Sequence, residues 1–258
     1  FVTGGSRGIG LAIALRAAAD GAQVAIAAKT ADPHPKLPGT IFTAADEIKA
    51  AGGTALPIQC DIRDEAQIEG AIGKTVSAFG GLDILVNNAG MTSVSSPAGS
   101  GEATELAAMS LESWSAGWSR NMDTTFLVTK HFLPKLRRSS QGRIIMVSSV
   151  TGHVMAMKNQ PIYAAAKAAM VGLTKSIALD GRPFNIACGQ IDIGNAATEM
   201  TERMAAGILQ ADGTTKVEPR MDVNHVADAV LHIAELPLES NVLFMTIMAT
   251  NMPYVGRG

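Results

Sequence analysis

Residues 1–10 read FVTGGSRGIG, and residues 11–19 continue as LAIALRAAA. An apolar start, a glycine-rich turn and an Ala/Leu run indicate a strand, a tight loop and a helix. The spacing of Gly4, Gly8 and Gly10 lets backbone approach a ligand closely, and the helix N-terminus behind them offers unpaired N–H groups to an anion. The stretch therefore predicts a parallel α/β fold whose first loop receives the pyrophosphate of a dinucleotide.

Strand and helix patterns alternate through the rest of the chain. Apolar, strand-like runs occur at 23–28, 55–60, 82–86, 144–147, 184–189 and 242–248. Helical patterns occur at 43–51, 65–79, 111–136, 163–179 and 223–236. This alternation predicts a doubly wound Rossmann domain with a parallel sheet of about seven strands and helices on both faces. With no Pro/Ser-rich linker in sight, we expect a single domain over 1–258 whose first strand is truncated at the N-terminus.

Composition argues against several classes of function. The chain has 21 Lys and Arg against 23 Asp and Glu, a net charge of −2, so we do not expect a nucleic-acid partner. Cys60 and Cys188 lie in apolar runs without metal-ligand spacing, which indicates free thiols in a reducing compartment and no metal site. The apolar stretches look too short to span a membrane, and no leader pattern stands at Phe1. We therefore expect a cytoplasmic protein without a membrane anchor.

A second informative stretch, residues 148–173, reads SSVTGHVMAMKNQPIYAAAKAAMVGL. Tyr163 and Lys167 are four residues apart in a helical pattern, so the phenol and the ammonium lie on the same face. A nearby cation favours phenolate and moves the tyrosine pKa toward neutrality, which allows proton transfer. Ser149, after an apolar strand, is placed to donate a hydrogen bond to a reacting oxygen, and Ser148 is the alternative. A Tyr and a Lys at this spacing also occur on ordinary helix surfaces.

The residues after the second predicted strand bear on the choice of cofactor. Sites for NAD usually place an acidic residue there to bind the ribose hydroxyls. This chain has Lys29 and Thr30 instead, and Arg7 in the glycine loop adds another cation. Two cations favour a 2′-phosphate, so we expect NADP, with NAD as the alternative because Asp32 can still reach the ribose.

Polar residues also mark the predicted ends of two further strands. Asp61 follows the run at 55–60, and Asn87, Asn88, Ala89 and Gly90 follow the run at 82–86. In doubly wound sheets ligands bind at the carboxyl ends of strands, although such residues also cap ordinary turns. Asn121 interrupts an apolar helical pattern, where a polar side chain needs a partner.

These signals, in this order, resemble the short-chain dehydrogenase/reductase family over essentially the whole chain. The resemblance rests on TGGSRGIG at 3–10, Asp61, NNAG at 87–90, Asn121, and Ser149 with Tyr163-x-x-x-Lys167. Residues 29–42, KTADPHPKLPGTIF, are similar to the hydroxysteroid-dehydrogenase-like subgroup. The resemblance implies an NAD(P)-dependent oxidoreductase that transfers a hydride between its cofactor and a carbonyl or secondary alcohol. The alternative is a regulatory protein that binds a dinucleotide without catalysis.

The resemblance also implies roles for particular residues. Tyr163 is the expected general acid/base and Ser149 orients the carbonyl. Lys167 binds the nicotinamide ribose and lowers the pKa of Tyr163, and Asn121 holds a water in the proton relay. Residues expected at the cofactor are Gly4, Ser6, Arg7, Gly8, Ile9, Gly10, Lys29, Asp61, Ile62, Asn88, Ala89, Gly90, Tyr163, Lys167 and Ile191.

The chain departs from the family pattern in two places. Ser149 and Tyr163 are one residue further apart than usual, and Cys188-Gly189 stands where we expect the Pro-Gly that follows the sixth strand. The second departure leaves the backbone of Ile191 as the expected contact to the nicotinamide amide.

The substrate is expected to be a small molecule, neutral and largely apolar, because mostly apolar residues should cover the nicotinamide. These residues are His153, Met155, Met157, Met200, Met204, Ile208 and Leu209. Arg203 and Lys158 are the residues to suspect if the substrate carries an anionic group. Helices at 115–137 and 163–180 are apolar on more than one face, so a homodimer or homotetramer is expected.

Overall fold

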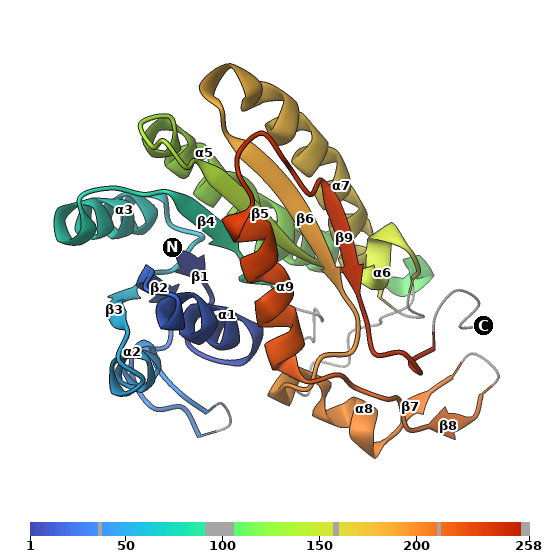
Figure 1. The fold of residues 1–258 in the computed structure, drawn as a ribbon. Helices are drawn as coiled ribbons and strands as arrows, with labels where there is room; N and C mark the ends of the chain where they lie inside the picture. The colour runs from blue at the N-terminus through green and yellow to red at the C-terminus, as the bar shows by residue number, and fades with distance from the viewer. Residues whose placement is uncertain (36–37, 91–105, 157–159, 211–212, 254–258) are drawn as a thin grey trace.

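The computed structural model describes residues 1–35, 38–90, 106–156, 160–210 and 213–253 (Figure 1). Its main sheet has seven strands in the order β3-β2-β1-β4-β5-β6-β9, and every neighbouring pair is parallel. The strands are β1 (Val2–Thr3), β2 (Gln23–Ala28), β3 (Thr54–Gln59), β4 (Ile84–Asn87), β5 (Arg143–Ser149), β6 (Ala187–Ile193) and β9 (Phe244–Ile247). The doubly wound sheet predicted from the alternating pattern is therefore confirmed.

Helices cover both faces of this sheet (Figure 1). Helices α1 (Gly8–Ala19), α2 (Ile41–Ala50) and α9 (Val223–Glu235) pack on one face, and α3 (Glu65–Phe79), α5 (Thr124–Leu136) and α7 (Pro161–Asp180) pack on the other. The short helices α4 (Leu111–Trp118), α6 (Val150–His153) and α8 (Glu202–Ala206) lie between these elements in the chain. The described short turns are η1 (Leu106–Ala108), η2 (Ser119–Asp123), η3 (Arg182–Phe184) and η4 (Glu199–Thr201), and β7 (Ile208–Leu209) pairs antiparallel with β8 (Thr215–Lys216).

Strand β5 shows how the sheet serves two cores at once. Ile145 and Val147 enter the core under α1 and α9, whereas Ile144 and Met146 enter the core under α5 and α7. Successive side chains of a strand point to opposite faces, and a parallel strand covered on both sides is apolar throughout. The continuous apolar run at 144–147 is therefore the sequence of a central strand.

Two predicted elements differ from the structure. The helix expected at 111–136 is divided into α4, the π-helical turn η2 and α5. The strand expected at 184–189 is wrong, because β6 runs from Ala187 to Ile193. The sequence did not indicate this strand end because Gln190 and Asp192 are polar. In the structure they are completely buried and hydrogen-bonded to each other. Cys188-Gly189 consequently lies inside the strand, and its carboxyl end is followed by Gly194.

Helix α7 also corrects an expectation. By length and composition it is apolar enough to cross a membrane, with a mean hydropathy of 1.2, whereas we expected no apolar stretch of that kind. Its residues Ala166, Met170 and Ile177 are buried in the core against the sheet. One face of the helix therefore packs against the sheet, and a third of its apolar window is buried.

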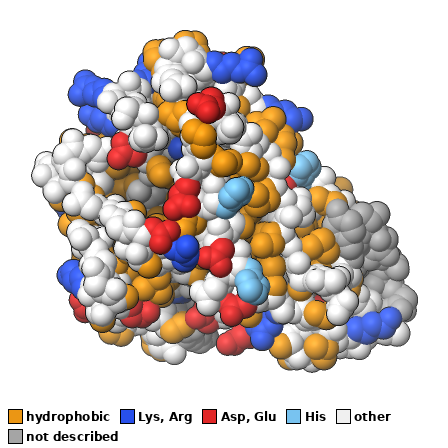
Figure 2. Space-filling view, in the orientation of Figure 1, with side chains coloured by type: hydrophobic (Ala, Val, Ile, Leu, Met, Phe, Trp, Pro, Cys, Tyr) orange, Lys and Arg blue, Asp and Glu red, His pale blue; other side chains and the backbone are white. Residues whose placement is uncertain are grey.

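The exposed surface carries charges of both signs. In the described part of the face shown in Figure 2, basic and acidic side chains are interspersed rather than gathered by sign.

Cys60 and Cys188 are buried free thiols, and burial raises their pKa to about 11 and about 12. Thiols held in the protonated form are poor nucleophiles and metal ligands.

We expect Phe132→Ala to lower the free energy of unfolding by about 3–5 kcal/mol, measured by urea denaturation, because it leaves a cavity in the core. The Phe132 side chain is 1% exposed, and its ring centroid lies 4.6 Å from that of Phe1. The matched control is Phe42→Ala on α2, where the side chain is 52% exposed and the expected loss is below about 1 kcal/mol. Equal losses at the two positions would contradict this description of the core.

Candidate active site

Three glycines of the loop lie where a side chain would be strained or would collide. Gly4 and Gly8 have φ angles of 65° and 54°, a region that favours glycine. A Cβ on Gly10 would lie 2.4 Å from the carbonyl oxygen of Gly4 and 2.5 Å from Nδ2 of Asn88. The loop therefore presses directly on the start of α1, and its backbone is open to a closely approaching ligand.

Asn88 and Ala89 hold this loop against the end of β4. The Asn88 side chain donates through Nδ2 to the carbonyl oxygens of Thr3 (2.9 Å) and Gly4 (3.3 Å). The backbone N–H groups of Asn88 and Ala89 both donate to the Thr3 hydroxyl at 3.0 Å. The sequence placed Asn88 beside the adenosine, and the structure adds that its amide fixes the shape of the loop.

Arg7 and its neighbours continue the loop. Arg7 donates from Nη2 to the carbonyl oxygen of Gly39 at 3.1 Å, and its buried Nε has no hydrogen-bond partner in the described part of the chain. Ser6 is buried, and Ile9 lines the cavity described below. Arg7 thus connects the glycine loop to the segment before α2, and its Nε remains as a buried hydrogen-bond donor.

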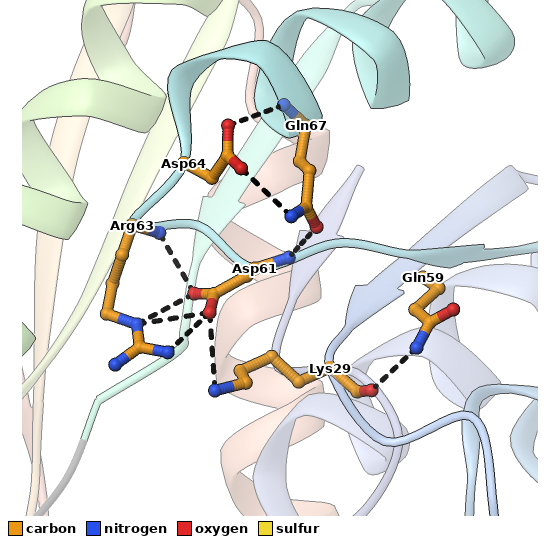
Figure 3. A network of polar contacts seen from close by, with 6 residues as sticks. All are labelled: Lys29, Gln59, Asp61, Arg63, Asp64 and Gln67. Atoms are coloured by element: carbon orange, nitrogen blue, oxygen red, sulfur yellow. Dashed lines mark hydrogen bonds and ion pairs between the residues drawn. The ribbon is translucent and has the colours of Figure 1, made fainter.

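Four charged or polar residues meet at the ends of β2 and β3 (Figure 3). Arg63 grips the Asp61 carboxylate, with Nε 2.9 Å from Oδ1, and Lys29 Nζ lies 3.2 Å from Oδ2. Gln67 accepts a hydrogen bond from the Asp61 backbone N–H at 2.9 Å. The hydrogen bond from Arg63 holds the pKa of Asp61 well below its usual range. Sequence reasoning missed Arg63, although a cation two residues after a strand-end acid was a usable signal.

This cluster brings together two residues that were predicted at different parts of the cofactor. Lys29 was expected at the 2′-phosphate and Asp61 at the adenine, yet they form an ion pair. The Lys29 side chain is 60% exposed, so it remains accessible to a ligand. Ile62, next to Asp61, packs partly against the core beneath α3 and α5.

The structure brings Ser149, Tyr163 and Lys167 to one place. Ser149 ends β5, accepts a hydrogen bond from the Thr151 N–H at 3.1 Å, and is hydrogen-bonded to Tyr163 in the first turn of α7. The Lys167 ammonium donates to the carbonyl oxygen of Val147 at 3.3 Å and lies 5.7 Å from the centroid of the Tyr163 ring. Ser148 is buried, with a hydroxyl that finds no partner among the described residues. Of the two serines, Ser149 is therefore the one beside the phenol.

Burial dominates the electrostatics of this group. Burial raises the pKa of Tyr163, and the hydrogen bond from Ser149 opposes that shift. Burial also lowers the pKa of Lys167 to about 8, and the charge of Asp192 opposes this second shift. The net shift of the Tyr163 pKa is upward, because desolvation of the phenolate outweighs the hydrogen bond from Ser149. The expected lowering of this pKa by Lys167 stays a prediction.

Asn121 and Gly90 complete the polar wall. Asn121 is 4% exposed in the π-helical turn η2 and donates from Nδ2 to the Gly117 carbonyl oxygen at 3.1 Å. A Cβ on Gly90 would lie 3.5 Å from Oδ1 of Asn121 and 3.6 Å from Nζ of Lys167. Gly90 thus leaves room between the end of β4 and these two side chains.

A cavity opens beside Ser149 and Tyr163, and most of its wall is apolar. The predicted Met155, Met200 and Met204 line it, together with Met252, which sequence reasoning missed. Its remaining lining residues are Ile9, Ser148, Val150, Thr151, Gln160, Ile193, Gly194, Asn195, Ala196, Thr198, Thr201 and Arg203. The Asn195–Thr198 segment could have been found in the sequence if the end of β6 had been placed correctly.

Several predicted contacts to this cavity need comment. The Ile191 side chain is completely buried in the core under α1 and α9, and β6 continues to Ile193, which lines the cavity. The expected contact of the Ile191 backbone with the nicotinamide stays a prediction. His153 is bonded to Asp192 instead of facing this cavity. Ile208 lies in β7. Met157, Lys158 and the side chain of Leu209 lie outside what the structure describes.

The arrangement matches a known family. The model of the short chain dehydrogenase family matches residues 1–208, and the chain therefore belongs to the short-chain dehydrogenase/reductase family of oxidoreductases. The sequence is 41% identical over 238 residues to hydroxysteroid dehydrogenase-like protein 2 of Danio rerio, covering 92% of this chain and 54% of that protein. The corresponding Xenopus laevis protein is 47% identical over 171 residues, covering 66% of this chain and 39% of that protein. The chain thus spans about half or less of the length of these relatives.

Solved structures agree with this assignment. A short-chain type dehydrogenase/reductase from Mycobacterium marinum superposes with a TM-score of 0.78 at 29% identity, covering 96% of this chain and 92% of that one. A short chain dehydrogenase from Burkholderia cenocepacia J2315, solved in complex with NADP, gives a TM-score of 0.76 at 30% identity, covering 96% and 94%.

Proposed function

We propose that the protein is an NAD(P)-dependent oxidoreductase that acts on a carbonyl or a secondary alcohol, with Tyr163 transferring the proton. The observation that carries the proposal is the contact of Tyr163 with Ser149 beside the buried ammonium of Lys167. A protein without catalysis has no physical need to keep a buried ammonium next to a phenol, since burying a charge costs free energy.

A dinucleotide fits the glycine loop as it stands, because Gly10 has no space for a Cβ and Gly4 adopts a left-handed conformation. Backbone at Gly4, Ser6, Gly8, Ile9 and Gly10 would hold the pyrophosphate at the N-terminus of α1. Asp61, Ile62, Asn88, Ala89 and Gly90 border the adenosine side of the same edge. When bound, the nicotinamide supplies or accepts the hydride.

The protein's own groups handle the proton and the substrate oxygen. Ser149 donates a hydrogen bond to that oxygen, and Tyr163 gives its phenolic proton to it or takes one from it. Burial raises the pKa of Tyr163, so the phenol holds its proton at neutral pH. It would give this proton to a carbonyl oxygen only as that oxygen gains negative charge from the hydride transfer. Lys167 keeps a positive charge near the phenol, and Asn121 extends the polar wall where a water can join the proton relay.

The cavity supports a neutral, largely apolar substrate. Four methionines, Met155, Met200, Met204 and Met252, provide an adaptable apolar wall. Arg203 is the charged residue among the described lining residues and is the group to suspect if an acidic substrate is found. The alternative function is dinucleotide binding without turnover. It differs from the proposed enzyme in that no substrate would occupy this cavity.

We expect Tyr163→Phe to lower kcat by about 100-fold or more while the Kd of the cofactor stays within a few-fold, because only the proton transfer is lost. Turnover is measured with NADPH and NADH against ketones and alcohols, and cofactor binding by calorimetry. Ser149→Ala should also reduce kcat strongly, whereas the matched control Ser148→Ala should reduce it much less. A wild-type protein that binds a dinucleotide yet is inert across a broad carbonyl and alcohol panel would favour the regulatory alternative.

We further propose that NADP is preferred over NAD. Lys29 is mostly exposed at the end of β2 and pairs with Asp61, which Arg63 also contacts. Arg7 lies in the glycine loop, where it donates to the Gly39 carbonyl oxygen. Two cations on one carboxylate leave an excess of positive charge for a 2′-phosphate, and Arg7 adds a third cation from the loop. The similar Burkholderia structure is a complex with NADP, which supports this preference.

We expect Lys29→Asp to shrink the difference in Kd between NADPH and NADH by about tenfold or more, because a cation next to the phosphate becomes an anion. The matched control is Lys49→Asp on α2, which makes the same change in net charge on an exposed helix end. Equal affinities of the wild type for the two cofactors would contradict the preference.

We also propose a homodimer or homotetramer. Phe126 on α5 and Leu179 on α7 are 52% and 59% exposed, and large exposed apolar side chains on adjoining helices favour association. Light scattering at micromolar concentration should therefore give a multiple of the monomer mass. Phe126→Glu combined with Leu179→Glu should lower that mass, while the exposed Phe42→Glu should leave it unchanged. A monomeric wild type would rule the proposal out.

A further inference from the structure

A carboxylate is buried directly behind the catalytic group. Asp192 of β6 is completely inaccessible, and both of its oxygens have partners: Oδ1 accepts from Nε2 of Gln190 at 2.7 Å, and Oδ2 is bonded to Nδ1 of His153. A buried carboxylate is costly unless it is hydrogen-bonded and its charge is balanced. The mechanism described so far makes no use of this residue.

The partners of Asp192 are held in place from the far side. The Thr174 hydroxyl of α7 donates to Oε1 of Gln190 at 2.9 Å, so the other end of the Gln190 amide points its N–H at Asp192. His153 ends α6, the short helix that follows Ser149, and 32% of its side chain is exposed. The chain of hydrogen bonds therefore presents donors to the carboxylate and reaches the solvent at His153.

Asp192 also lies next to the lysine site. Ser148 is its cross-strand partner in the register of β5 and β6, and Lys167 donates to the carbonyl oxygen of the preceding residue, Val147. Side chains of registered neighbours project from the same face of a sheet, so the Ser148 hydroxyl, which has no partner among the described residues, and the Asp192 carboxylate share the face covered by α7.

The charge of Asp192 acts on Lys167. Burial lowers the pKa of Lys167 to about 8, and Asp192 is the group that raises it against that shift. On the elements packed against α7, other titratable or charged residues that the structure describes are Glu112, Arg120, Asp123, Arg143, His153, Arg182 and Cys188, and on α7 itself Tyr163, Lys175 and Asp180. Among all of these described groups, it is the carboxylate of Asp192 whose charge acts on the Lys167 ammonium.

We propose that Asp192 is a positioning residue of the active site, the buried counter-charge that keeps Lys167 an ammonium, and that His153 fixes this carboxylate and connects it to solvent. The inference rests on the proposed function only in that Lys167 serves Tyr163. An ammonium is what the site needs from Lys167, because only the charged form can stabilise the negative charge that develops on the phenol oxygen when Tyr163 gives up its proton. Asp192 thus sets the upper end of the pH range in which Tyr163 works.

The first test measures the pKa of Lys167 directly by NMR on protein labelled with ¹³Cε-lysine, with the signal assigned by its loss in Lys167→Met. Asp192→Asn keeps the size of the side chain but removes its charge, and it should lower the Lys167 pKa by about one unit or more. Thr174→Val perturbs the same buried chain without changing a charge, and it should leave this pKa within a few tenths of a unit. An unchanged pKa in Asp192→Asn would overturn the proposal.

The second test is the pH profile of kcat/KM. The alkaline fall in activity should move to lower pH in Asp192→Asn by the same shift seen by NMR, because one unit changes the ratio of ammonium to amine tenfold. A purely structural role would reduce activity at every pH without moving the profile. If the Lys167 pKa shifts but no substrate is turned over, the role of Asp192 is supported and the proposed enzymatic function fails. If substrate is turned over but the Lys167 pKa does not shift, the enzymatic function is supported and the role of Asp192 fails.

A third variant covers the case in which Asp192→Asn does not fold. In the Lys167→Met background the carboxylate has no ammonium to balance, so adding Asp192→Asn should be neutral or stabilising in urea denaturation. Recovery of folding in the double variant supports the pairing of the two charges. Failure of both variants to fold would mean that the carboxylate is needed regardless of Lys167, which contradicts the proposal.

Discussion

The close packing at Gly10, which leaves no space for a side chain, is the constraint on which the site depends. Only a glycine lets the start of α1 lie against the Gly4 carbonyl and the Asn88 amide, at distances where a Cβ would collide. This contact fixes β1, α1 and the end of β4 relative to one another. Because parallel strands direct their carboxyl ends to one edge, fixing these three elements also fixes where polar groups from β5 and β6 meet them.

The catalytic end of that edge is governed by the cost of burying charge. Lys167 and Asp192 are buried and Tyr163 is partly buried at the cavity wall, and the environment shifts the pKa of the tyrosine upward and that of the lysine downward. Hydrogen bonds offset part of this cost. Ser149 is bonded to Tyr163, and Lys167 donates to the Val147 carbonyl oxygen. Gln190 and His153 are bonded to the Asp192 carboxylate. Such a site is pre-organised, since its dipoles and charges are placed before any substrate arrives.

The other end of the edge is wet and strongly charged. Asp61, Lys29 and Arg63 are partly or mostly exposed, so their ion pairs are screened by solvent and contribute little to stability. They can exchange partners when an anionic ligand approaches. The edge of the sheet therefore combines a largely buried group around Lys167 and Asp192 with an exposed, charged group around Asp61.

The sequence by itself determined the sheet, most helices and the meeting of Ser149, Tyr163 and Lys167, because these follow from local periodicity and from the rule that strand ends share one edge. Only the tertiary structure showed that Ser149 is hydrogen-bonded to Tyr163, that Lys29 pairs with Asp61, and that β6 extends to Ile193. It also placed Ile191 in the core and His153 on Asp192. These outcomes depend on contacts between residues far apart in the chain and on buried polar pairs, whose side chains resemble surface residues when read along the sequence.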